Sequence, residues 1–352
     1  VLALAIIVGL FFGLSRFITD LMWYGQLGFQ SVVWTQLGVK IGLWVAYALL
    51  MALTGFVSAW LAIRARPDSA DGSTIRINGD VVEVGKSVSS KTARRVAVVI
   101  SLIVGVIFGS QFNANWSEIL LMFNAQSFGT TDPQFGLDNG FYVFVLPGLK
   151  LVLAAVAMLL GVGLVFSVVT HVLMGGIRIT MPVNGRGLFS ITKRCRRQLG
   201  IWLMLNMFAW AVRQMIGVFD QLTVQGSRIT GASYTAVHAN IPVTFIMAAL
   251  TAILGVVLGI WLMRSHTLEG QASIGVRASA ALKAWRVPVT SIAVVVVVGL
   301  VLTVAWPVLL QRFRVNPNAQ EMESTYIQRN IDATRDAYGL DKHKNEQYKT
   351  TD

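Results

Sequence analysis

LVLAAVAMLLGVGLVFSVVTHVLMGGI, at residues 151–177, holds no lysine, arginine, aspartate or glutamate. A helix that crosses the hydrocarbon core of a bilayer needs about 20 mostly apolar residues, so we predict that this stretch spans a membrane. The composition agrees, because 55% of the 352 residues are hydrophobic and only 13% are charged, against about 25% charged in soluble domains. A water-soluble globule is excluded, and a single cysteine, Cys195, excludes a disulfide scaffold.

Further apolar runs lie on both sides of this one. Most are uncharged, while the two weaker runs contain Arg16 or Arg213 near the end expected at the outer interface, which a long side chain can reach. The predicted fold is an all-α polytopic membrane helix bundle, residues 1–310, with seven transmembrane helices. The spans are expected at about residues 1–18, 41–63, 96–115, 148–172, 199–219, 241–263 and 288–310.

The positive charge is concentrated in three loops. Residues 64–95, 173–198 and 264–286 hold 17 of the 29 basic and 5 of the 17 acidic residues, so the remainder carries 12 of each. An excess of lysine and arginine marks cytoplasmic loops. We therefore predict a multi-pass protein of the plasma membrane with a cytoplasmic N-terminus and an extracytoplasmic tail. Since the net charge of +12 resides in these loops, nucleic acid is not an expected partner.

The first basic loop contains a predicted small cytoplasmic β-hairpin. Two short runs of alternating polarity, residues 74–77 and 80–84, flank Asn78-Gly79, and Asn-Gly strongly favours a type I′ turn.

Two segments on the other side are predicted to be helices lying in the membrane interface, where aromatic rings are favoured. The first covers residues 19–36 and the second begins at Asn115. Their aromatic and apolar residues are Trp23, Tyr24, Phe29 and Trp34 in the first, and Trp116, Ile119, Leu120 and Phe123 in the second.

The fifth span has the sharpest polar feature. Asn206, Arg213 and Asp220 are spaced by seven residues, so they share one helix face, and Gln214 is adjacent to it. Polar groups in hydrocarbon usually face a bundle interior, a partner charge or water. Two interpretations stay open. The face lines a polar cavity or substrate path, or Asn206 bonds a neighbouring helix while Arg213 and Asp220 lie in the outer interface.

Residues 132–147, DPQFGLDNGFYVFVLP, combine turn signals with an aromatic run that re-enters the membrane. The carboxylates of Asp132 and Asp138 with Asn139 could bind a cation, although their spacing matches no EF-hand loop. The favoured alternative is a turn in which aspartates cap their own backbone.

Glycine pairs of the form G-x-x-x-G occur in three spans and allow helices to approach closely, either within the chain or between subunits. They are Gly9/Gly13, Gly105/Gly109 and Gly255/Gly259.

Catalytic signatures are missing from the sequence. The four histidines form no i, i+4 pair, no zinc pattern can be assembled, and no G-x-S-x-G turn is present. We therefore predict no catalytic residue, no metal ligand and no cofactor, which favours a non-enzymatic role.

Four segments together resemble an uncharacterised bacterial family of polytopic membrane proteins, of the UPF type, that is frequent in actinobacteria and cyanobacteria. They are residues 23–29 (WYGQLGF), the 132–147 loop, residues 231–235 (GASYT) and the tail pattern of residues 315–340. The loop matches the most distinctive family motif at positions whose role is unknown: Asp132, Pro133, Phe135, Asp138, Gly140, Phe141, Tyr142, Phe144 and Pro147. The chain departs from the pattern at Ala236, where the family has an aspartate, and at Ser324 and Thr325, where a proline is usual.

This resemblance implies seven spans and a large extracytoplasmic C-terminal domain that is absent here, but it carries no activity and no catalytic residues. Residues 311–352 would be an extracytoplasmic helical linker to that domain. In residues 319–340, Ile327, Ile331, Thr334 and Tyr338 recur at helical spacing. We expect that side to dock on the bundle.

Three functions follow as hypotheses. The first is a cell-envelope binding or scaffold protein, or complex subunit, that anchors an extracytoplasmic domain. The second is a lipid or small-solute transporter that uses the polar face of the fifth span. The third is an envelope enzyme whose active site lies in the absent domain. Expected partners are membrane lipids, other envelope or membrane proteins and a second copy of the chain.

Overall fold

The structure is a computed structural model that describes residues 2–66, 73–77, 80–84, 89–179, 189–224, 230–265 and 274–340. Most of this part is helical. The longer helices are α1 (Leu2–Gln26), α2 (Gln30–Arg64), α3 (Ser90–Ala114), α5 (Leu146–Leu173), α6 (Lys193–Gly217), α7 (Ile241–Arg264), α8 (Ile274–Leu300) and α10 (Ala319–Ala337). The shorter helical segments are α4 (Trp116–Phe123), η2 (Phe141–Val145), η3 (Val218–Leu222), η4 (Ala236–Asn240), η6 (Val301–Ala305), α9 (Trp306–Leu310), η7 (Gln311–Val315) and η8 (Asn316–Asn318).

Within the described residues, six helical segments are long and apolar enough to cross a membrane, which indicates a membrane protein. They correspond to the second through seventh predicted spans and are Gln30–Arg64, Ser90–Ser110, Phe141–Leu173, Lys193–Leu222, Ala236–Arg264 and Trp285–Ala337. The first predicted span falls in α1, whose side chains are described only from residue 11 onward. A seventh crossing therefore stays a prediction.

The segment 19–36 is not a separate interfacial helix, contrary to the prediction. Its first part continues α1 to Gln26, and its second part begins α2 at Gln30. The chain turns at Gly28, whose φ of +77° favours glycine and commonly ends helices. Phe17 of α1 and Trp34 of α2 pack edge to face at 6.2 Å, so these aromatic residues hold a helical hairpin together. The second predicted interfacial segment forms a helix of its own, α4.

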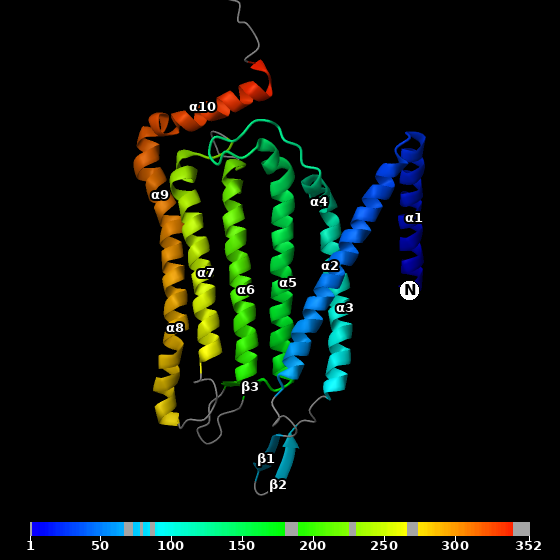
Figure 1. The fold of residues 1–352 in the computed structure, drawn as a ribbon, viewed down its shortest axis with the longest axis vertical. Coiled ribbons are helices and arrows are strands. Elements are labelled where there is room, and N and C mark those ends of the chain that lie inside the picture. Colours follow the sequence, from blue (N-terminus) through cyan, green and yellow to red (C-terminus); the bar gives the residue numbers. More distant parts are fainter. Residues whose placement is uncertain are drawn as a thin grey trace, which may run out of the picture.

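The helices lie side by side in a row, and α10 lies across the row at one end of the helix axes (Figure 1). This side of the molecule is called the α10 end. The main helix contacts join α3 to α2, α2 to α5, α5 to α6, α6 to α7 and α7 to α8. α1 packs beside the first part of α2. Each helix thus rests mainly on its neighbours in the row, and many large apolar side chains remain exposed on the surface.

Two of the glycine pairs lie where neighbouring helices approach closely. A Cβ at Gly105 of α3 would lie 2.5 Å from the backbone oxygen of Ala48 in α2, and one at Gly109 would lie 2.9 Å from the Ala48 Cβ. At Gly255 and Gly259 of α7, a Cβ would collide with methionine side chains of α6. These pairs serve packing within the chain, as helix seams with small residues do. Gly13, by contrast, has nothing within 4 Å.

Polar groups join three helices on the side of the molecule opposite the α10 end. The Gln198 amide of α6 donates to the Ser58 carbonyl of α2 at 2.9 Å, and the His171 Nε2 of α5 lies 3.0 Å from the Gln198 Oε1. Ser58 and His171 are fully buried. Because polar groups in an apolar interior need partners, these bonds fix how α2, α5 and α6 converge.

In the part of the chain that the structure describes, two short pairs of antiparallel strands lie between helices. β1 (Ser73–Ile77) pairs with β2 (Asp80–Val84), with Ser73 opposite Val84 and Ile77 opposite Asp80. These strands occupy the residues of the predicted hairpin, whereas its Asn78-Gly79 turn lies outside the described residues. β3 (Ile177–Ile179) pairs with β4 (Phe189–Ile191) just before α6.

Candidate functional site

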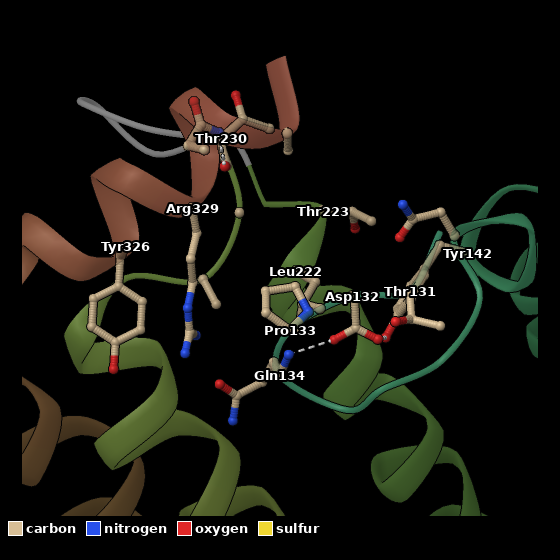
Figure 2. Close-up of a pocket in the computed structure, with 15 residues that line it drawn as sticks. Thr131, Asp132, Pro133, Gln134, Tyr142, Leu222, Thr223, Thr230, Tyr326 and Arg329 are labelled. Atoms are coloured by element: carbon tan, nitrogen blue, oxygen red, sulfur yellow. Dashed lines mark hydrogen bonds between the residues drawn. The ribbon is translucent and has the colours of Figure 1, made fainter. Parts of the chain in front are cut away.

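The α10 end gathers three stretches that are far apart in the sequence. They are the loop that precedes α5, the segment that leads into α7, and α10 itself, and together they line a cavity (Figure 2). The aspartates of the 132–147 loop shape the first wall.

Asp138 closes the loop on itself. Its Oδ1 accepts hydrogen bonds from the backbone amides of Phe128 and Gly140, at 3.0 and 2.7 Å. Its Oδ2 accepts from the Ser127 hydroxyl and the Gly129 amide, at 2.5 and 3.1 Å. The Ser127 hydroxyl and then the amides lower the pKa of the Asp138 carboxyl to about 2, because they stabilise its charged form.

Asp132, which is buried, likewise accepts hydrogen bonds from the backbone of the turn that it begins. Its Oδ1 accepts from the amides of Gln134 and Phe135, at 2.8 and 2.6 Å. Its Oδ2 accepts from the Leu137 amide and the Tyr142 hydroxyl, at 2.9 and 2.8 Å. Burial alone would raise the pKa of Asp132, but these hydrogen bonds together lower it below its ordinary value.

Both carboxylates therefore cap their own backbone, as the Asx-turn alternative predicted. Each of the four carboxylate oxygens accepts two hydrogen bonds from nearby residues of the chain. Neither carboxylate is therefore free to bind a cation, as the other interpretation would require. Gly140 is required for the same geometry, because a Cβ there would collide with the Gln126 carbonyl oxygen.

The aromatic residues of the motif pack around one ring in η3, the short helix that follows α6. The ring of Phe219 in η3 lies 5.0 Å from that of Phe135, 5.3 Å from Phe141 and 6.4 Å from Tyr142, each edge to face. Phe144 packs on Phe128 in the same way. The loop is thereby fixed on the end of α6.

The polar residues predicted on the fifth span, which is α6, contact two different neighbouring helices. The Asn206 amide donates to the Leu160 carbonyl of α5 at 3.1 Å, whereas the Gln214 amide donates to the Thr251 hydroxyl of α7 at 3.1 Å. Arg213 is exposed. The helix thus places Asn206 and Gln214 in different helix contacts.

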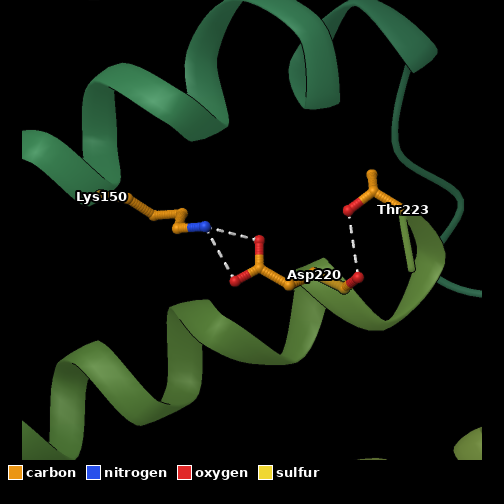
Figure 3. A network of polar contacts seen from close by, with 3 residues as sticks. All are labelled: Lys150, Asp220 and Thr223. Carbon is orange, nitrogen blue, oxygen red and sulfur yellow. Dashed lines mark hydrogen bonds and ion pairs between the residues drawn. The ribbon is translucent and has the colours of Figure 1, made fainter. Parts of the chain in front are cut away.

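Asp220, at the end of the same face, pairs with Lys150 of α5. The Lys150 ammonium lies 2.8 and 2.9 Å from the two carboxylate oxygens, and the Thr223 hydroxyl donates to the Asp220 carbonyl (Figure 3). Both charged side chains are partly exposed. Such a pair contributes only about 1 kcal/mol or less, so its main effect is to orient the ends of α5 and α6.

α10 docks through polar side chains. The Glu323 carboxylate, which is buried, accepts from the Tyr234 amide at 3.1 Å, and the Asn330 amide donates to the Thr230 carbonyl at 2.8 Å. Tyr234 in turn stacks on His238 with ring centroids 4.1 Å apart. Two segments that resemble the family pattern, residues 231–235 and the tail, therefore meet here.

The predicted docking side of α10 is only partly right. Ile331 and Tyr338 are 39% and 77% exposed, and Thr334 is exposed as well. The hydrogen bonds come instead from Glu323 and Asn330, because the segment beneath α10 presents the Tyr234 amide and the Thr230 carbonyl to them.

The cavity between these walls has a volume of about 330 Å³. Asp132, Pro133 and Gln134 line one side, and Tyr326, Arg329 and Asn330 of α10 line another. The Arg329 guanidinium points from α10 into the space between them (Figure 2). Sequence reasoning missed Arg329, because it is one of 7 basic residues in a tail, residues 311–352, that also holds 7 acidic residues.

Comparison with protein families matches residues 1–352 to UPF0182, an uncharacterised protein family. A UPF0182 protein of Bifidobacterium longum is 99% identical over the full chain, and one of Bifidobacterium adolescentis is 77% identical over 351 residues, again 100% of this chain. A UPF0182 protein of Corynebacterium diphtheriae is 32% identical over 92% of the chain.

These matches cover 33%, 32% and 30% of the three relatives, so the chain spans about one third of their length. No solved structure matches. The loop, the 231–235 segment and the tail that resembled a UPF family meet at one site, and the family match extends over every residue. The chain belongs to the UPF0182 family of actinobacterial proteins.

Proposed function

We propose that this chain is the membrane part of a cell-envelope scaffold or complex subunit, which anchors and orients an extracytoplasmic domain. The observation that carries the proposal is the docking of α10. Its Glu323 and Asn330, which lie seven residues apart on α10, bind the Tyr234 amide and the Thr230 carbonyl of the segment that leads into α7. Two such anchors fix both the position and the direction in which the chain leaves the helix row.

The loop supports this role. Asp132 and Asp138 use their oxygens on their own backbone, so they give the α10 end a defined shape rather than a reactive carboxylate. The surface of the helix row also supports binding to partners. Large apolar side chains remain exposed along α8, among them Val294, Val297 and Leu300, and lipids, envelope proteins or a second copy would cover them.

The transport alternative receives less support. Asn206 and Gln214 hydrogen-bond to α5 and α7, and Asp220 pairs with Lys150. These contacts favour helix packing over a substrate path. An envelope enzyme with its active site outside this chain is the remaining rival, and turnover by the full-length protein would support it.

The proposal includes an orientation. Residues 1–310 cross the plasma membrane seven times from a cytoplasmic N-terminus, the β1–β2 hairpin is cytoplasmic, and residues 311–352 lead into an extracytoplasmic domain. The excess of basic residues in the loops at the strand-bearing end supports it.

Cysteine labelling tests this orientation. Cys195 is fully buried, so Cys195→Ala gives a background for single exposed cysteines. In intact cells, a membrane-impermeant maleimide is expected to label Ser324→Cys of α10, whereas Lys193→Cys, exposed at the start of α6, is labelled only after permeabilisation. The reverse pattern would invert the topology and contradict the proposal.

The assembly itself tests the function. We expect the full-length protein, isolated from its own membrane in mild detergent, to carry envelope proteins in a fixed ratio by light scattering and mass spectrometry. The double variant Glu323→Ala with Asn330→Ala should lose them, because it removes both anchors of α10. The control Gln320→Ala with Asp336→Ala changes one amide and one acid at exposed positions of the same helix. A lone chain that retains a small bound substrate would refute a scaffold role.

A further inference from the structure

Arg329 presents a positive charge to the cavity at the α10 end without a carboxylate to match it. Asp132 is the acidic residue among the lining side chains, and both its oxygens accept hydrogen bonds from its own loop and Tyr142. Among the described residues, Arg329 forms no ion pair, and its ring contact is with Tyr326 at 5.5 Å. The guanidinium is therefore available to a guest.

Neutral donors face the same space. The side chains of Gln134, Thr131 and Thr230 line the cavity, and within the described part of the chain they take part in no hydrogen bond. Asn330 and Thr223 also line it, but they are already bonded to the Thr230 and Asp220 carbonyls. One cation and three uncommitted polar side chains thus converge on one volume.

We propose that this cavity binds the phosphate group of a small organic phosphate. A guanidinium fork binds the oxygens of a carboxylate or a phosphate in pairs. A carboxylate has only two oxygens, which the fork alone would satisfy. A phosphate offers further acceptor oxygens, which the Gln134 amide and the threonine hydroxyls can reach.

The size and walls of the cavity fit such a guest. About 330 Å³ is at the small end of ligand pockets. Pro133, Leu222 and Ala333 supply apolar wall for the carbon portion of the ligand. The phosphate could belong to a lipid headgroup or to a water-soluble molecule, since both present the same group to Arg329.

Two probes separate these sources in the full-length protein. Glycerol 3-phosphate is titrated by calorimetry into protein in detergent, and phosphatidylglycerol is supplied in nanodiscs and its retention is measured by native mass spectrometry. Saturable binding of glycerol 3-phosphate indicates a soluble ligand, and retention of phosphatidylglycerol alone indicates a lipid. In either case Arg329→Gln should weaken binding about tenfold or more, because it removes charge-assisted hydrogen bonds.

The matched control is Arg335→Gln, which removes an exposed arginine from the same helix outside the cavity and should bind like the natural protein. Gln134→Glu is a second variant. It places a carboxylate in the cavity, so it should abolish binding while the melting temperature without ligand is kept or raised. The proposal is overturned if neither probe binds saturably, or if Arg329→Gln and Arg335→Gln weaken binding equally.

Discussion

Replacing Gly105 with leucine is expected to prevent α3 from packing stably on α2. Even a Cβ at this position would lie 2.5 Å from the Ala48 backbone oxygen and 3.1 Å from the Ala52 Cβ. A backbone oxygen cannot rotate away as a side chain can, so the helices must separate along their seam. Overpacking commonly costs 1–3 kcal/mol, and with rigid backbone on one side we expect about 3 kcal/mol or more.

Thermal unfolding of the purified protein in detergent measures this loss. Gly42→Leu is the matched control, because it makes the same change in α2 at a position where a Cβ meets nothing within 4 Å. Its melting temperature should stay near that of the natural protein. Equal losses in the two variants would show that the leucine acts through its lipid or detergent contacts rather than through the seam, since leucine has the higher helix propensity and cannot lower stability by that route.

The second large effect is expected for Asp132→Ala. The change leaves three backbone amides and the Tyr142 hydroxyl without their acceptor in a buried turn. Buried donors without partners cost free energy, and we expect a loss of roughly 2–4 kcal/mol from the stability of the loop. Faster amide exchange at Gln134, Phe135 and Leu137 would report the loss directly.

Asp132→Asn should have an intermediate effect on the loop, because it keeps one acceptor oxygen and presents an NH₂ group to the other donors. Its exchange rates should fall between those of the natural protein and Asp132→Ala. Asp336→Ala, which removes an exposed carboxylate from α10, should leave the loop unchanged. Protection in Asp132→Ala equal to that in Asp336→Ala would mean that aromatic packing around Phe219 holds the loop without the carboxylate.

The features that the sequence predicted well are those set by local rules. Hydrocarbon demands long apolar helices, so six of the expected spans have counterparts in the structure. The turn at Asp132 was accessible for the same reason, because its carboxylate caps amides two to five residues away. For Asp138 this holds only for the Gly140 amide, since the Phe128 and Gly129 amides lie ten and nine residues earlier. The G-x-x-x-G pairs at Gly105 and Gly255 were likewise visible as sites of close approach.

The features that were missed depend on partners distant in the chain. α2 begins at Gln30, well before its apolar run, because Gly28 turns the chain and Phe17 packs on Trp34. Periodicity suggested an apolar docking side for α10, but the surface opposite it presents the Tyr234 amide. Arg329 gained its significance only when folding brought the loop and α10 together around it.

The single file of helices has a mechanical consequence. In a closed bundle, helices on one side support those on the other, and the bundle resists bending. A single row has no second layer, so its curvature is set by the packing angle between each pair of neighbouring helices. Where two glycines let backbones touch, as between α2 and α3, that angle is stiff. Where contact is sparser, as between α7 and α8, the angle is less constrained by the helices themselves. α10 follows α8 in the chain and bonds to the segment before α7, so it bridges this seam and limits the change of angle there.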